Sequence, residues 1–429
     1  MKIFIHTLGC KVNQYESQSV FEGFESLGFE ATDNFSDADV ILVNSCTVTA
    51  ESSRKSRQAL RKYRKANEKA VIILSGCMAS AFPKTALDLP EANIIIGNNG
   101  YGNIIDTYKR FISSDGSQLI EINEHQSGEK IEDLSISSFN ERTRAYIKVQ
   151  DGCNRFCSYC AIPYARGRVR SRDIKSIKCE SERLAQNGFK EIVLVGINLT
   201  SYGTGENFDL CDVVEAVAST EGVERIRFGS IEPDHLTDNF LMRLSKIKKF
   251  CPQFHLSLQS GCDKTLKDMN RHYDTKFYHS LVKKIRETFE NPSITTDIMV
   301  GFAGETEQDF IESLEFCRSM GFARMHVFAY SRREGTKAYN FSNQVENSVK
   351  EARSKSMSEM ARASEKEFLE SQIGKTVTVL FEKEEKGFWW GYSENYSYIS
   401  VKSKENLNNK ILTAKIEKAF ENHCEAILI

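Results

Sequence analysis

The sequence of 429 residues has little of several features that mark particular protein classes. It contains only 6 Pro and 2 Trp, it has no low-complexity tract, and its net charge is −2. No apolar run is long enough to span a bilayer, and the first residues lack the apolar core of a secretion signal. We therefore expect a cytoplasmic protein without membrane contact. Because the overall charge is small, any nucleic-acid contact must come from local basic patches.

Cysteine, by contrast, is frequent, with 12 residues. In a reducing compartment, so many thiols favour metal binding or catalysis over disulfides. Cys153, Cys157 and Cys160 fall within one short segment, and no fourth Cys or His follows close by, as a structural zinc site would require. Three thiolates on a short loop can instead hold three irons of a four-iron cluster and leave the fourth iron open. Free thiols or half of a zinc site are the alternatives.

A second group of thiols follows predicted strands near the N-terminus. Short apolar strands alternate there with helices, which predicts an open parallel sheet with helices on both faces. The predicted strands are Lys2–His6, Asp39–Val43, Ala70–Leu74 and Asn93–Ile96. The first three run into loops that carry Cys10, Cys46 and Cys77. Because ligands gather at the carboxyl ends of such strands, we predict a second site of three thiolates. The alternative is that Cys is simply common at buried strand ends.

The helix predicted near Glu51–Lys65 is strongly basic, and four basic residues lie on one of its faces. These residues are Arg54, Arg57, Arg61 and Lys65. They could hold RNA phosphates or form a solvated surface.

The rest of the chain divides by composition. Residues 113–138 are polar and predict a linker with one strand, at Gln118–Ile122. Strands and helices then alternate about six times, which is fewer than the eight units of a closed barrel. After a long polar helix at Ser348–Gln372, five short strands predict a small antiparallel barrel. We thus predict an N-terminal α/β domain at 1–112, the linker at 113–138, a barrel core at 139–370 and a small barrel at 371–429.

Several of these motifs resemble the radical SAM (S-adenosylmethionine) methylthiotransferase family. The C-x-x-x-C-x-x-C spacing at 153–160 is the signature of radical SAM enzymes, and residues 7–16, 44–49 and 75–77 resemble the N-terminal domain of the methylthiotransferases. The barrel segment is similar throughout, except that Ala303 stands where the family usually has Pro. Residues 391–396 resemble the TRAM domain, an RNA-binding barrel. The forms LGCKVNQYES and NSCTVT most resemble the branch that acts on N6-threonylcarbamoyladenosine at position 37 of tRNA.

The resemblance implies an α/β fold in three parts: an open parallel sheet, a partial (β/α)6 radical SAM barrel and a TRAM barrel. It also implies two 4Fe-4S clusters, with SAM both as radical source and as methyl donor. The catalytic cluster would be held by Cys153, Cys157 and Cys160, and the auxiliary cluster by Cys10, Cys46 and Cys77. The residues implied to contact SAM are Tyr159, Asn198, Glu232, Gln259 and Ser260.

The implied reaction adds a methylthio group to carbon 2 of N6-threonylcarbamoyladenosine in tRNA. Alternatives are the same chemistry on isopentenyladenosine in tRNA or on an aspartate of a ribosomal protein, and a non-catalytic iron–sulfur carrier. We expect a monomer whose partners are tRNA, an electron-donor protein and a source of sulfur or clusters. Arg166 and Arg168 belong to an alternating basic run that could hold substrate phosphate, the SAM carboxylate or nearby acids.

Overall fold

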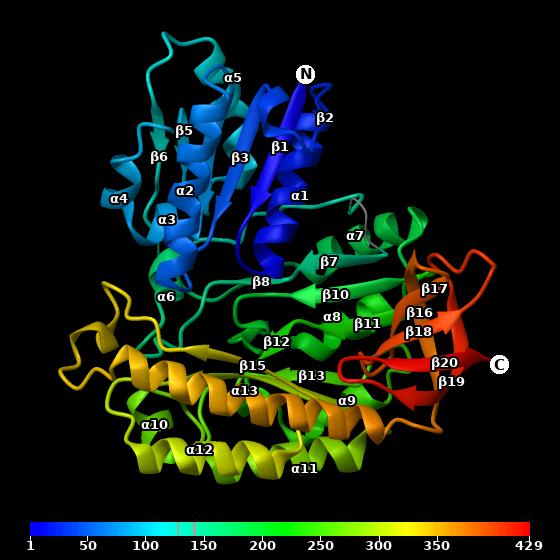
Figure 1. The fold of residues 1–429 in the computed structure, drawn as a ribbon. Coiled ribbons are helices and arrows are strands. Elements are labelled where there is room, and N and C mark those ends of the chain that lie inside the picture. Colours follow the sequence, from blue (N-terminus) through cyan, green and yellow to red (C-terminus); the bar gives the residue numbers. More distant parts are fainter. Residues whose placement is uncertain (127, 140–142) are drawn as a thin grey trace.

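The computed structural model describes residues 1–126, 128–139 and 143–429. Figure 1 shows an N-terminal sheet beside one end of a central open barrel, and a small barrel at another side of that central part. None of the helices within the described ranges is long and apolar enough to cross a lipid bilayer.

The N-terminal part is a six-stranded parallel sheet with the strand order β2-β1-β3-β4-β5-β6. Its strands are β1 (Lys2–Thr7), β2 (Glu30–Ala31), β3 (Val40–Ser45), β4 (Val71–Gly76), β5 (Ile94–Ile96) and β6 (Leu119–Glu121). Its helices are α1 (Lys11–Glu25), α2 (Ala50–Ala66), α3 (Cys77–Ala81), α4 (Pro83–Leu87) and α5 (Ile104–Ile112). All residues of β3 are buried, as expected for a strand covered on both faces. Strand β6 lies within the predicted linker 113–138, and it extends the sheet by pairing with β5.

The central part contains two parallel sheets, β11-β10-β7 and β12-β13-β14-β15. Its strands are β7 (Arg144–Lys148), β10 (Glu191–Val195), β11 (Arg225–Phe228), β12 (Ser230–Ile231), β13 (Gln253–Leu256), β14 (Ser293–Val300) and β15 (Arg324–Ala329). Only Gly229 separates β11 from β12, so the two sheets continue one another as an arc of six strand positions. This arrangement confirms the predicted open barrel.

Helices cover the outside of the central arc (Figure 1). They are α7 (Ile174–Gln186), α8 (Leu210–Ala218), α9 (Asp238–Ser245), α10 (Asp263–Asp268), α11 (Thr275–Thr288), α12 (Glu307–Met320) and α13 (Asn347–Glu370). The short helix α6 (Ile162–Arg166) lies instead against α3 of the N-terminal part. A small antiparallel pair, β8 (Gln150–Asp151) and β9 (Arg170–Ser171), flanks the loop between β7 and α7.

The C-terminal part is a closed barrel with the strand order β16-β17-β18-β20-β19. Its strands are β16 (Thr376–Glu385), β17 (Phe388–Ser393), β18 (Tyr398–Lys402), β19 (Ile411–Ala419) and β20 (Cys424–Leu428). The predicted barrel is confirmed, but the expectation that it is wholly antiparallel is wrong, because β18 and β20 run parallel. Neighbours in a closed ring cannot alternate in direction all the way round when the number of strands is odd. One parallel pair is therefore unavoidable.

Candidate functional site

The N-terminal thiols lie at one edge of the sheet. Cys46 and Cys77 directly follow β3 and β4, and Cys10 lies three residues after the end of the adjacent strand β1. A Cβ atom added to Gly9 would lie 2.9 Å from the Cys46 Sγ, so the loop before Cys10 passes directly against Cys46. A Cβ atom on Gly76, whose φ is +94°, would lie 2.4 Å from a backbone oxygen of β3. Both glycines are therefore needed for the close approach of these loops.

Asn13 holds two of these loops together. Its Nδ2 donates to the carbonyl oxygens of Leu8, at 2.8 Å, and Ser45, at 3.0 Å. Cys46 and Cys77 are buried, and burial raises the pKa of Cys77 to about 12, whereas Cys10 is exposed. Buried thiols with a raised pKa become good ligands when a bound cation compensates the thiolate charge. The donor set therefore fits an iron–sulfur cluster.

The second set of thiols lies on the loop that follows β8. The Cys153 backbone N–H donates to the Gly167 carbonyl oxygen at 3.0 Å, and the Cys160 N–H donates to the Cys157 carbonyl oxygen at 2.9 Å. Burial, together with the nearby Cys157 thiol, raises the pKa values of Cys153 and Cys160. The Arg271 Nη1 donates to the Cys157 Sγ at 3.2 Å. Three neighbouring thiols with a cationic donor beside them suit a four-iron cluster with one open iron.

The predicted SAM contacts follow strand ends around this loop. The Nδ2 of Asn198 lies 3.8 Å from the Cys153 Sγ, and Glu232 forms an ion pair with Arg271. The structure therefore brings both residues next to the cysteine loop. Arg271 was missed by the sequence analysis, because no spacing pattern links it to the cysteines.

The other three predicted SAM contacts have different surroundings. Tyr159 is partly buried, and its ring lies 6.4 Å from that of Phe302. Gln259 follows β13 with a φ of +73° and is mostly buried. The Ser260 Oγ accepts a hydrogen bond from the backbone N–H of Cys262 at 3.2 Å. This hydrogen bond holds the Ser260 hydroxyl within its own turn. SAM contacts by Tyr159, Gln259 and Ser260 stay predictions.

The prediction that Arg166 contacts RNA is wrong, because its side chain is 0% exposed. Its Nη1 and Nη2 donate to the Glu16 carboxylate at 2.7 and 2.8 Å, and its Nη1 also reaches Asp151. Its Nε lies 3.2 Å from the Cys77 Sγ. Arg166 ends α6, a helix that starts two residues after Cys160. One short segment therefore joins the two sets of thiols.

Other residues predicted to bind RNA lie at the surface. Arg54, Arg61 and Lys65 are exposed on α2, and Arg57 is half-buried. Arg54 pairs with Glu51, and Arg61 pairs with Glu91.

Arg168 differs from Arg166 in the same basic run, because its side chain is exposed. Its guanidinium carbon lies 4.6 Å from the centre of the Phe156 ring. RNA contact by Arg168 and by the four α2 residues stays a prediction.

A cavity of about 670 Å³ lies where the three parts of the fold meet. Cys10 and Lys11 line it from the N-terminal part, Arg144 and Arg227 from the central arc, and Tyr396 from the C-terminal barrel. The ammonium of Lys11 forms no ion pair or hydrogen bond within the described part of the chain. Burial and the two arginines lower the pKa of Lys11. An anionic group in the cavity would favour the charged form of this lysine.

Comparisons with known proteins agree with this arrangement. Residues 2–97 match the model of Uncharacterized protein family UPF0004, and residues 147–317 match the Radical SAM superfamily. The threonylcarbamoyladenosine tRNA methylthiotransferase MtaB of Bacillus subtilis is 34% identical, covering 97% of this chain and 94% of the relative. A tRNA-2-methylthio-N(6)-dimethylallyladenosine synthase of Clostridium perfringens is also 34% identical, covering 97% and 96%.

A solved structure shows the same fold at low identity. The radical S-adenosylmethionine methyltransferase TsrM of Kitasatospora setae has a TM-score of 0.57 and 13% identity, covering 79% of this chain and 76% of TsrM. Membership of the radical SAM superfamily implies a 4Fe-4S cluster and SAM, which suits the thiols of the 153–160 loop. Because curated relatives match 97% of its length at 34% identity, this chain belongs to the radical SAM methylthiotransferase family.

Proposed function

We propose that this protein adds a methylthio group to carbon 2 of N6-threonylcarbamoyladenosine at position 37 of tRNA. Curated relatives that are named for the threonylcarbamoyl and for the dimethylallyl substrate are equally similar in identity, so identity alone does not choose between them. The observation that favours the first substrate is the unpaired ammonium of Lys11 in the cavity beside Cys10. The threonylcarbamoyl group carries a carboxylate, whereas the dimethylallyl group is apolar.

Two clusters would divide the chemistry. Cys153, Cys157 and Cys160 would hold the first cluster, and Cys10, Cys46 and Cys77 would hold the second. When bound, the first supplies the electron that cleaves SAM to methionine and a 5′-deoxyadenosyl radical, and the second supplies sulfur to the product.

The protein's own side chains would position these groups. Asn198 and Glu232, beside the cysteine loop, are proposed to contact SAM, together with Tyr159, Gln259 and Ser260. Arg271 keeps a positive charge against the Cys157 sulfur, which stabilises negative charge there. Lys11 would bind the threonyl carboxylate and so orient the nucleoside relative to Cys10.

The remaining assignments are part of the same proposal. Residues 371–429 would act as an RNA-binding barrel, and the exposed basic residues of α2 would hold tRNA phosphates. Arg168 would extend that surface. We also propose a barrel core at 139–370 and a small barrel at 371–429, whereas the N-terminal part extends beyond residue 112 to include β6. The proposal further includes a monomeric state, an electron-donor protein, a sulfur source and a cytoplasmic location.

The test is methylthiolation of defined substrates by the reconstituted protein under anaerobic conditions. Purified tRNA that carries either N6-threonylcarbamoyladenosine or N6-dimethylallyladenosine at position 37 is incubated with SAM and reductant, and nucleosides are measured by mass spectrometry. We expect the 2-methylthio product from the first tRNA only. Product from the dimethylallyl tRNA alone would refute the proposed substrate. If neither tRNA yields 5′-deoxyadenosine, the proposed enzyme activity is refuted.

A further inference from the structure

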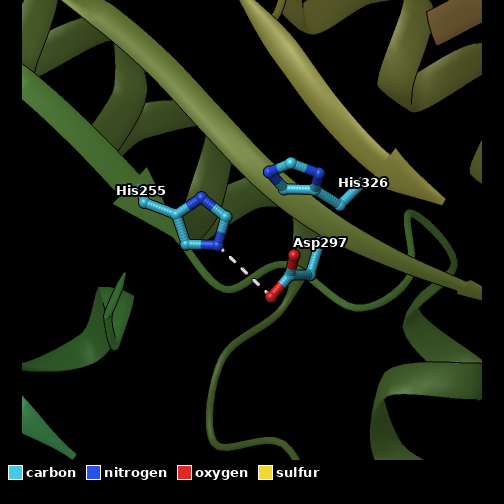
Figure 2. A group of neighbouring side chains, drawn as sticks. All are labelled: His255, Asp297 and His326. Atoms are coloured by element: carbon cyan, nitrogen blue, oxygen red, sulfur yellow. Dashed lines mark ion pairs between the residues drawn. The ribbon is translucent and has the colours of Figure 1, made fainter. Parts of the chain in front are cut away.

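Three side chains from three neighbouring strands face the inside of the open barrel: His255 on β13, Asp297 on β14 and His326 on β15 (Figure 2). Asp297 lies directly opposite His326 in the strand register, and His255 lies opposite Thr295, two positions before Asp297. Residues two apart on a strand point to the same face, so the three side chains gather on one surface. All three line the cavity described above.

The candidate ligand atoms of these residues lie close together. One nitrogen from each imidazole and one carboxylate oxygen all lie within 4.8 Å of one another, and the His255 Nε2 is 3.2 Å from the Asp297 Oδ2. Ligand atoms on one zinc ion are about 3.0–3.6 Å apart, given bonds of about 2.0–2.2 Å. Small side-chain rotations would therefore bring the set into binding geometry.

The surroundings of the two imidazoles support a metal-binding role. The His255 Nδ1 is 3.0 Å from the Thr295 Oγ1, and this contact fixes the imidazole ring. The Nε2 of His255 is then directed at Asp297. The ring of His326 makes no hydrogen bond or ion pair within the described part of the chain. Since the side chain of His326 is exposed to the cavity, its nitrogens are free to bind.

We propose that His255, Asp297 and His326 bind one divalent transition-metal ion of the zinc type. Two imidazoles and a carboxylate form a ligand set used by catalytic zinc, and it leaves at least one position open towards the cavity. The set contains no thiolate. Asp297 also lies three residues before Val300, where β14 ends, about 10 Å from that end at 3.3 Å per residue. The ligand set is therefore distinct from both sets of cysteines, although Cys10 lines the same cavity.

The competing explanation is a hydrogen-bonded pair of His255 and Asp297 with no metal. That pair accounts for the 3.2 Å contact, but it gives no reason for a second, unpaired histidine on the next strand. The two explanations differ in whether His326 is needed for binding.

The experiment measures zinc binding by the reconstituted protein with its clusters in place. Anaerobic equilibrium dialysis against buffered free Zn²⁺ is followed by mass-spectrometric counting of zinc and iron per chain. His326→Ala removes one ligand, and Asp297→Asn removes another with little change in size. Thr295→Val removes no ligand but deletes the hydroxyl that contacts His255 and Gln253. His279→Ala, an exposed histidine on α11, is the matched control.

We expect the wild type and His279→Ala to bind about one zinc per chain without loss of iron. Loss of an outer partner costs about 10–100-fold in metal affinity, so Thr295→Val should weaken binding in that range, and both ligand variants should weaken it further. Equal zinc binding by the wild type and His326→Ala would overturn the proposal and leave only the hydrogen-bonded pair. His326 is exposed, so His326→Ala should keep the wild-type melting temperature.

Discussion

Replacement of Arg166 by Gln should strongly destabilise the protein. The guanidinium is 0% exposed and donates to both carboxylate oxygens of Glu16, which is itself 0% exposed. Without it, Glu16 and Asp151 would share the Lys148 ammonium, at 2.7 and 2.6 Å, and Arg170 would remain 3.9 Å from Asp151. Removal of one partner from a buried ion network costs about 3–5 kcal/mol, because an uncompensated charge stays buried. At about 2–4 °C per kcal/mol, the melting temperature should fall by about 6–20 °C.

The loss should depend on pH. In the wild type, the Lys148 and Arg166 charges outweigh burial and hold the pKa of Asp151 below its ordinary value. A carboxyl group with a lowered folded-state pKa adds stability above its unfolded pKa, and this stability is lost as pH falls. In the Arg166→Gln variant part of this favourable contribution is missing. Because the wild type loses the contribution only below the unfolded pKa of about 3.9, the difference from the wild type should be smaller at pH 3.5 than at pH 8.

The assay is thermal unfolding of the anaerobically reconstituted protein, with Arg168→Gln as the matched control. Arg168 lies two residues away in the same basic run, but its side chain is exposed, so its variant should shift the melting temperature by less than about 2 °C. The Glu16→Gln/Arg166→Gln double variant should lose less than the sum of the single losses. A shift below about 2 °C for Arg166→Gln, or an equal difference from the wild type at pH 8 and at pH 3.5, would refute the reasoning.

Three further changes test other parts of the structure. Cys46→Ala should lower the iron content from about eight to about four per chain while SAM cleavage continues; loss of all iron would contradict two independent clusters. Lys11→Met should raise KM for threonylcarbamoyl tRNA with little change in kcat, and Lys11→Arg should restore the wild-type KM. Unchanged KM and kcat in Lys11→Met would argue against a contact between Lys11 and the carboxylate. For Glu191, burial opposes ionisation but Arg227, Arg144 and Arg225 lower its pKa, so Glu191→Gln should cost stability at neutral pH. That cost should shrink below the unfolded pKa of about 4.3, and an equal melting-temperature loss at pH 7 and pH 3.5 would contradict it.

Local patterns were enough to predict most elements. The predicted alternation of strands and helices is present in the central part. Its helix α12, for example, begins where the Thr306 hydroxyl caps the first turn and ends at Gly321, which has the left-handed conformation. The convergence of Cys10, Cys46 and Cys77 followed from parallel strands that each end in a cysteine. Such features depend on residues next to one another in the sequence.

Features that depend on distant partners could not be predicted. The alternating run that contains Arg166 and Arg168 suggested one shared basic face, yet Arg166 meets Glu16, and Arg172 meets Glu180. Nothing in the local pattern distinguishes an arginine that will be buried against a distant carboxylate from one that will be exposed. The cluster of His255, Asp297 and His326 was missed for the same reason, since strand pairing alone brings its members together.

The charge network around Arg166 also bears on how the two thiol sites work together. Glu16 comes from α1 of the N-terminal part, whereas Lys148, Asp151 and Arg166 come from the central part. A buried network of this kind adds little net stability, but any other docking of the two parts would leave charges buried and unpaired. We infer that the network fixes one relative position of the two parts. Because Arg166 also contacts the Cys77 sulfur, the same network fixes the spacing between the two sets of cysteines, as the proposed use of both on one nucleoside requires.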